Sequence, residues 1–181
     1  MRSVTGALVD SPNCVVVFDD DVRYIRLVER VLACAGIRVE PITTVDVNDG
    51  VKIVEAHAPL AVLVDIFMYD AARGYDFIER LRGDPATRRI PIIVASGADR
   101  ELRRNAAWLE ELGCDVLQKP FPADDLVESV RRAPLRRKPL LINGDGCPRR
   151  PAEPDDLPHT LVRWFERARH VIYGARRTAA P

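Results

Sequence analysis

Short apolar runs alternate along most of the chain with segments whose apolar residues recur every three or four positions. A run of four to six apolar residues is typical of a buried strand, whereas the longer spacing is typical of one face of a helix. The runs predict strands at residues 14–18, 37–42, 60–64, 90–95 and 115–118. The periodic segments predict helices at residues 22–36, 46–58, 75–83, 99–112 and 122–133.

This alternation determines the expected fold class. Strands that are apolar along nearly their whole length need cover on both faces, and right-handed crossover connections place helices there. We therefore expect residues 13–133 to form one α/β domain with a five-stranded parallel sheet between two helical layers, a doubly wound arrangement.

The two ends of the chain have a different character. Residues 1–12 are predicted to be an N-terminal extension, and the proline-rich and arginine-rich residues 134–156 to be a linker. Residues 157–175 predict an amphipathic helix, because apolar residues recur there three and four positions apart. Its apolar stripe is wide enough to pack on a globular surface, either of its own chain or of a partner.

Composition excludes several classes. No apolar run approaches the ~18 residues of a membrane span, and the first residues lack the apolar block of a signal peptide, so the cytoplasm is the expected location. The cysteines are widely spaced without a CxxC pair, which favours buried free thiols over disulfides or a zinc site. They are Cys14, Cys34, Cys114 and Cys147. The net charge is +0, although basic residues concentrate after residue 133.

Polar residues stand where the predicted strands end. In open parallel sheets the carboxyl ends of the strands share one edge, and reactive groups gather there. We therefore expect one crevice to contain all the polar residues at these ends. They are Asp19, Asp20 and Asp21 after the first strand, Asp65 after the third, Ser96 after the fourth and Lys119 after the fifth.

These residue types fit one reaction. Two carboxylates ~4 Å apart repel each other by roughly 4 kcal/mol at an effective dielectric near 20, so the aspartates need a cation. Asp19, Asp20 and Asp65 offer the oxygen ligands that Mg²⁺ prefers. Asp65 can act as a nucleophile towards a phosphoryl group while Lys119 and the Ser96 hydroxyl stabilise its charge.

The same residues closely resemble the receiver domain of two-component response regulators, which has a flavodoxin-like fold. The resemblance covers about residues 13–133 and includes the acidic pair after "VVVF", "VLVDIFM" around Asp65, Gly74, "IIVASG" and "KPF". It implies that Asp65 accepts phosphate from a sensor histidine kinase or a phosphotransfer protein. It also implies that the protein catalyses only its own phosphorylation and dephosphorylation and signals to a downstream protein.

The resemblance also implies roles for neighbouring groups. Asp20, Asp65 and the backbone carbonyl of Phe67 would bind Mg²⁺ directly, with Asp19 reaching it through water. Asp21 would lie at the start of the first helix, where the helix dipole favours a carboxylate.

Two positions depart from the family pattern. Tyr69 stands where the family usually has proline, and the loop before Gly74 is one residue longer. Val116 occupies the place where the family often has a switch tyrosine or phenylalanine. We therefore expect a phosphorylation signal to move Ser96 and its loop without an aromatic rotamer change.

Alternative interpretations stay open at this point. A haloacid-dehalogenase-like phosphatase also has aspartates after an apolar strand, but its motif needs threonine or valine where Arg23 stands. A DNA-binding transcription regulator using the basic tail is disfavoured, because one predicted helix is too little for a helix-turn-helix module. Homodimerisation through residues 157–175 or through the fourth-helix face is compatible with the sequence.

Overall fold

The computed structural model describes residues 13–43, 46–68 and 73–135. The predicted N-terminal extension, all but the first residues of the predicted linker and the predicted helix at 157–175 lie outside the described residues. The strands are β1 (Cys14–Phe18), β2 (Arg38–Ile42), β3 (Ala61–Val64), β4 (Ile92–Ser96) and β5 (Cys114–Gln118). The helices are α1 (Val22–Cys34), α2 (Val47–His57), α3 (Arg73–Gly83), α4 (Asp99–Arg104), α5 (Ala106–Glu111) and α6 (Ala123–Arg132).

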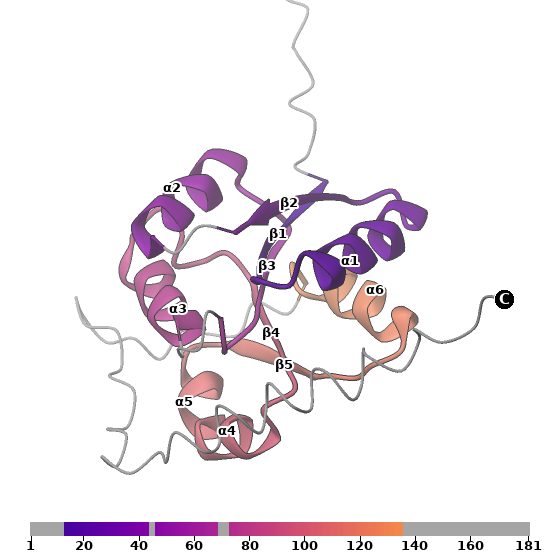
Figure 1. The fold of residues 1–181 in the computed structure, drawn as a ribbon. Helices are drawn as coiled ribbons and strands as arrows, with labels where there is room; N and C mark the ends of the chain where they lie inside the picture. Colours follow the sequence, from indigo (N-terminus) through magenta and orange to yellow (C-terminus); the bar gives the residue numbers. More distant parts are fainter. Residues whose placement is uncertain (1–12, 44–45, 69–72, 136–181) are drawn as a thin grey trace, which may run out of the picture. The chain divides into compact units, whose positions relative to one another are not determined.

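The strands form one parallel sheet in the order β2-β1-β3-β4-β5. Alternate residues of the central strands face opposite sides, so Val15 and Val17 pack with α1 and α6, whereas Val16 and Phe18 pack towards α2 and α3. Figure 1 shows these two helical layers on either side of the sheet. The predicted five-stranded parallel sheet with helices on both faces is therefore confirmed.

The order of the strands brings Asp19 and Asp65 to neighbouring positions at the carboxyl edge of the sheet. β1 lies between β2 and β3, so the chain leaves the carboxyl ends of β1 and β3 in opposite directions along the sheet. In open parallel sheets, ligands generally bind beside such a switch in direction. Asp19 follows β1 and Asp65 follows β3, which places both aspartates at this point.

The predicted helix at residues 99–112 is wrong in one respect, because Asn105 divides it into α4 and α5. The Asn105 backbone leaves the helical region, at φ −101° and ψ 11°. Its side-chain amide donates to the Glu101 carbonyl and to the Tyr75 hydroxyl, both at 3.0 Å. Asparagine competes with the helix in this way through local side-chain hydrogen bonds. Trp108 of α5 is buried and packs edge-to-face on Tyr75.

The two outer strands and one cysteine also differ from expectation. β2 and β5 have several exposed residues because each has a neighbouring strand on one side only. Cys14 and Cys114 are buried free thiols, as predicted, but Cys34 is exposed, because it points away from the buried side of α1. No helix among the described residues has the length and apolar character needed to cross a bilayer.

Candidate functional site

Asp19, Asp65 and Lys119 form a direct ionic cluster at the carboxyl edge of the sheet. The Lys119 ammonium Nζ lies 2.9 Å from Asp19 Oδ2 and 3.1 Å from Asp65 Oδ2. The Asp19 side chain is 2% exposed and that of Lys119 is 19% exposed, so the pair is largely screened from water. The structure thus brings together three of the predicted residues, which come from loops after three different strands.

Backbone hydrogen bonds between neighbouring strands fix this geometry. The Asp65 N–H donates to the Phe18 carbonyl at 2.9 Å, so Asp65 starts its loop beside the end of β1. The Lys119 N–H donates to the Ser96 carbonyl at 2.9 Å, which places the lysine beside the end of β4. The peptide bond from Lys119 to Pro120 is cis. The hydrogen bond to Ser96 fixes the Lys119 backbone, and the Lys119 side chain reaches Asp19 and Asp65 from there.

The cluster has more negative than positive charge. Burial raises the pKa of Asp19 to about 6, and although the Lys119 ammonium lowers it, the nearby Asp65 carboxylate raises it further. Burial alone lowers the pKa of Lys119, but Asp65 and Asp19 outweigh burial, so its pKa lies above the ordinary lysine value. Lys119 thus stays protonated, yet one ammonium does not balance the formal charges of Asp19, Asp20 and Asp65. The surplus favours a further cation.

The donor set fits a hard divalent cation, although the carboxylates do not form a closed cage. Within the described residues, no three acidic, histidine or cysteine side chains converge on a common point. Lys119 Nζ lies between Asp19 and Asp65 and acts as their counter-ion. Asp20 and Phe67 are half-buried beside them. Carboxylate and carbonyl oxygens in a crevice are the ligands of Mg²⁺ sites that retain water molecules.

Asp21 caps the first helix, as the resemblance implies. Its carboxylate accepts hydrogen bonds from the N–H groups of Arg23 at 2.9 Å and Tyr24 at 3.3 Å. Its own N–H donates to Asp19 Oδ1 at 2.8 Å. The third aspartate of the run therefore stabilises the helix start and orients Asp19 through its backbone.

Asp21→Ala is expected to lower the free energy of unfolding by about 1 kcal/mol, the usual cost of losing an N-cap side chain. Asp46→Ala is the matched control, because Asp46 caps α2 in the same way, accepting from the N–H groups of Asn48 and Asp49, far along the chain from the cluster. Urea unfolding should give similar losses for both variants. An unchanged Asp21→Ala protein would contradict the capping role.

Ser96 joins the cluster through its backbone. It is 1% exposed, and its hydroxyl accepts a long hydrogen bond of 3.4 Å from the Ala98 N–H. Its carbonyl is the acceptor for Lys119 described above. Val116 lies on β5, pairs in register with Val94 and is 47% exposed. The residue at this position of the outer strand is thus aliphatic and exposed.

Close packing against the Asp65 backbone requires glycine at position 74. A Cβ atom at this position would lie 2.0 Å from the Asp65 carbonyl oxygen and 2.7 Å from the Ile66 Cα. The Gly74 N–H donates to the Ile66 carbonyl at 3.0 Å. The start of α3 therefore packs directly on the backbone that carries Asp65.

Tyr24 also contacts the cluster, although the sequence did not predict it as a site residue. Lys119 Nζ lies 3.6 Å from the centroid of its ring. The only sequence signal is an aromatic residue on the first turn of α1, close to the aspartate run, which a core position explains equally well.

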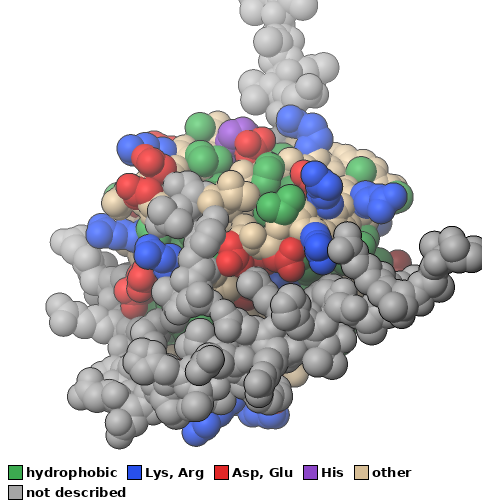
Figure 2. Space-filling model, viewed as in Figure 1, with side chains coloured by type: hydrophobic (Ala, Val, Ile, Leu, Met, Phe, Trp, Pro, Cys, Tyr) green, Lys and Arg blue, Asp and Glu red, His purple; other side chains and the backbone are tan. Residues whose placement is uncertain are grey.

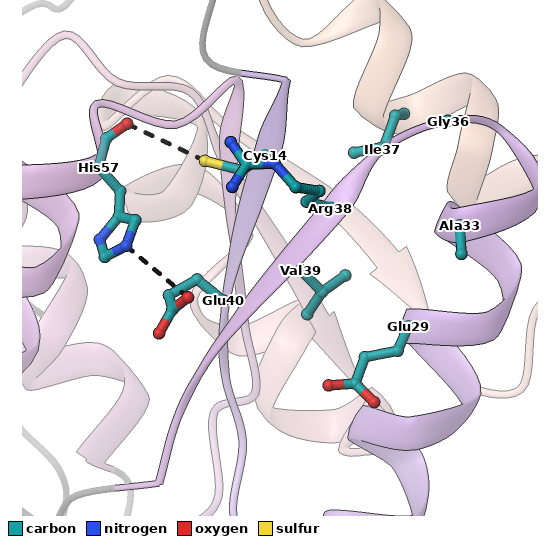
Figure 3. A pocket seen from close by; sticks show the side chains of 9 residues that line it. All are labelled: Cys14, Glu29, Ala33, Gly36, Ile37, Arg38, Val39, Glu40 and His57. Carbon is teal, nitrogen blue, oxygen red and sulfur yellow. Dashed lines mark hydrogen bonds and ion pairs between the residues drawn. The ribbon is translucent and has the colours of Figure 1, made fainter.

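A cavity lies elsewhere in the described residues. Its volume is about 510 Å³, and its lining includes Cys14, Gly36, Arg38 and His57 at the opposite ends of the strands from Asp19 and Asp65. In Figure 3 the His57 ring faces Glu40, and the Cys14 sulfur points towards the His57 backbone. His57 Nε2 lies 3.7 Å from Glu40 Oε2. None of the predicted site residues lines this cavity. Figure 2 shows acidic and basic side chains interspersed over the described part of one face of the molecule.

The chain resembles known proteins over the described domain. RcaC of Microchaete diplosiphon is 28% identical over 121 residues, 67% of this chain and 18% of RcaC. The acid tolerance regulatory protein ActR of Rhizobium meliloti is 27% identical over 130 residues, 72% of this chain and 64% of ActR. The chain thus spans only part of the length of both relatives.

A solved structure supports the same relationship. The receiver domain of the sensor histidine kinase PA1611 from Pseudomonas aeruginosa PAO1 has a TM-score of 0.56 and 25% identity, covering 66% of this chain and 95% of that chain. That structure contains a magnesium ion coordinated in its active site cleft. The profile of the response regulator receiver domain matches residues 15–131. With this match and the five-stranded parallel sheet, the chain belongs to the receiver domain family of two-component response regulators.

Proposed function

We propose that this chain is a phosphoacceptor that receives a phosphoryl group on Asp65. The observation that carries the proposal is the buried cluster in which Lys119 Nζ contacts both Asp19 and Asp65. The ammonium beside the Asp65 carboxylate can stabilise the negative charge of a phosphoryl group that forms on it. The donor is a sensor histidine kinase or a phosphotransfer protein, as membership of the family suggests.

Phosphoryl transfer to Asp65 changes no oxidation state, so it needs no redox partner. An Asp65 carboxylate oxygen attacks the phosphorus atom, the phosphorus–nitrogen bond of the donor's phosphohistidine breaks, and the leaving imidazole takes up a proton. Lys119 stabilises the charge on the phosphoryl oxygens from its fixed position at the end of β5. The Ser96 hydroxyl is proposed to donate to the same group after leaving the Ala98 N–H.

Magnesium fits this proposal. Asp20, Asp65 and the Phe67 carbonyl are proposed to hold Mg²⁺ directly and Asp19 through water, as membership of the receiver domain family suggests. Bound Mg²⁺ would neutralise the developing charge of the transfer. The surplus negative charge around Lys119 favours the binding of Mg²⁺ by these residues.

Asp20→Ala is expected to abolish measurable Mg²⁺ binding in isothermal titration calorimetry, because it removes a proposed direct ligand. Asp21→Ala is the neighbouring control and should bind Mg²⁺ as the wild type does, since its carboxylate caps α1. Equal Mg²⁺ affinity in the wild-type and Asp20→Ala proteins would show that the division of roles within the run is wrong.

The test of the proposed function is phosphate uptake by the full-length protein from acetyl phosphate. Intact-mass spectrometry should show one added phosphoryl group in the presence of Mg²⁺ and none after chelation with EDTA. A wild-type protein that remains unlabelled with Mg²⁺ and excess donor would overturn the proposal.

We propose that the phosphorylated domain signals by contacting a downstream protein. Val116 on β5 lacks an aromatic ring, so the movable elements near the phosphoryl group are Ser96 and the turn that leads into α4. The break at Asn105 is proposed as the point at which α4 shifts relative to α5. A cytoplasmic location suits a kinase partner. Dimerisation through residues 157–175 or through α4 and α5 remains a proposal for the full-length protein.

A further inference from the structure

The ring of Tyr24 covers the ammonium group of Lys119. Nζ lies 3.6 Å from the ring centroid, well inside the ~6 Å limit of a cation–π contact. Tyr24 is 9% exposed and belongs to the first turn of α1. Lys119 therefore has neighbours from three separate parts of the chain, namely Asp19 after β1, Asp65 after β3 and the ring on α1.

The ring has a fixed place of its own. The Tyr24 N–H donates to the Asp21 carboxylate, which ties its backbone to the helix cap. Phe121 packs edge-to-face on the ring, with centroids 6.5 Å apart and an interplanar angle of 81°. Phe121 follows Lys119 by two residues, so the ring packs against both the lysine head group and the chain just beyond it. These contacts orient the π-face before any ligand arrives.

The ring differs from the carboxylates in one respect that matters for phosphoryl transfer. Asp19 and Asp65 attract Lys119, and both are also proposed to bind Mg²⁺, directly or through water. An aromatic face attracts an ammonium without a formal charge, so it neither repels an incoming phosphoryl group nor competes with carboxylate oxygens for a hard metal ion.

We propose that Tyr24 is a positioning residue, whose ring holds Lys119 Nζ beside Asp65 for phosphoryl transfer. The inference rests on the proposed function of Asp65 as phosphoacceptor. It adds a determinant from α1 that lies outside the set of ionic residues and acts only through Lys119.

The test compares three full-length variants with the wild type in acetyl phosphate uptake with Mg²⁺. Tyr24→Leu keeps an apolar side chain but removes the π-face, and Tyr24→Phe keeps the ring. Val28→Ala is the control for general destabilisation, because Val28 is buried on the same helix and belongs to the same apolar cluster as Tyr24. The rate at saturating donor should fall about threefold to thirtyfold for Tyr24→Leu, with an unchanged half-saturating donor concentration. Tyr24→Phe and Val28→Ala should stay within about twofold of the wild type.

A second readout is independent of activity. An aromatic face shifts the NMR signals of the Lys119 ε-methylene protons upfield. This ring-current shift should persist in Tyr24→Phe and Val28→Ala and disappear in Tyr24→Leu. A shift that stays in Tyr24→Leu would overturn the proposed contact.

The outcomes separate this inference from the proposed function. Equal rates for Tyr24→Leu and the wild type would overturn the positioning role while leaving Asp65 as the phosphoacceptor. Equally slowed Tyr24→Leu and Val28→Ala proteins would overturn it as well, because the effect would then be structural. A wild type that takes up no phosphate would overturn both.

Discussion

An Asp65→Asn protein is expected to take up no phosphate from acetyl phosphate under conditions that label the wild type. The amide has nearly the shape of the carboxylate but is not a nucleophile, so the covalent step has no acceptor atom. Lys119 also loses one of its two carboxylate contacts, at 3.1 Å, and keeps the contact with Asp19. Intact-mass spectrometry after incubation with Mg²⁺ measures the effect directly.

Asp21→Asn is the matched control for this change. It makes the same carboxylate-to-amide replacement near the cluster, and asparagine is as good an N-cap as aspartate, so α1 should keep its start. Its phosphate uptake should equal that of the wild type. Equal labelling of Asp65→Asn and the wild type would mean that another residue accepts the phosphate.

Gly74→Ala is expected to destabilise the fold by about 3 kcal/mol or more, at the upper end of the usual cost of overpacking. The added Cβ would lie 2.0 Å from the Asp65 carbonyl oxygen and 2.7 Å from the Ile66 Cα. Both neighbours are backbone atoms, so no side-chain rotation relieves the clash. The start of α3 or the Asp65 backbone must move, and phosphate uptake should fall together with the free energy of unfolding.

Gly83→Ala tests whether the effect belongs to the site rather than to glycine in α3. Gly83 ends the same helix, and a Cβ there would meet no atom within 4 Å. Its replacement should be neutral or stabilising by up to about 1 kcal/mol, because alanine restricts the unfolded chain. Urea unfolding curves that are alike for the two variants would contradict the close packing at Gly74.

The order of elements and the sheet were predictable because hydrophobic patterns report burial directly. Apolar runs such as Cys14–Phe18 are fully buried central strands, and the periodic residues of α1 face the sheet. The pattern does not report how a side chain bonds locally. Asn105 lies inside a helical pattern, but its amide bonds to Tyr75, a residue far away in the sequence, and the helix divides there.

The sequence likewise allowed us to predict that the polar residues at the strand ends lie together. It did not allow us to predict which of them contact each other. Parallel strands bring their carboxyl ends together, so Asp19, Asp65 and Lys119 had to share an edge. Which carboxylate Lys119 contacts depends on distances within that edge, and the structure shows that it contacts two. Tyr24 escaped prediction because an aromatic residue facing the core and one facing an ammonium have the same sequence pattern.

The most direct test of the central claim is to locate the phosphoryl group on the labelled protein. Borohydride reduces an aspartyl phosphate to homoserine, and tandem mass spectrometry of the digested protein identifies the position. The account predicts homoserine at position 65 alone, with Asp19, Asp20 and Asp21 unmodified. Homoserine at one of those three positions, or a phosphate that survives on a serine or histidine, would contradict it.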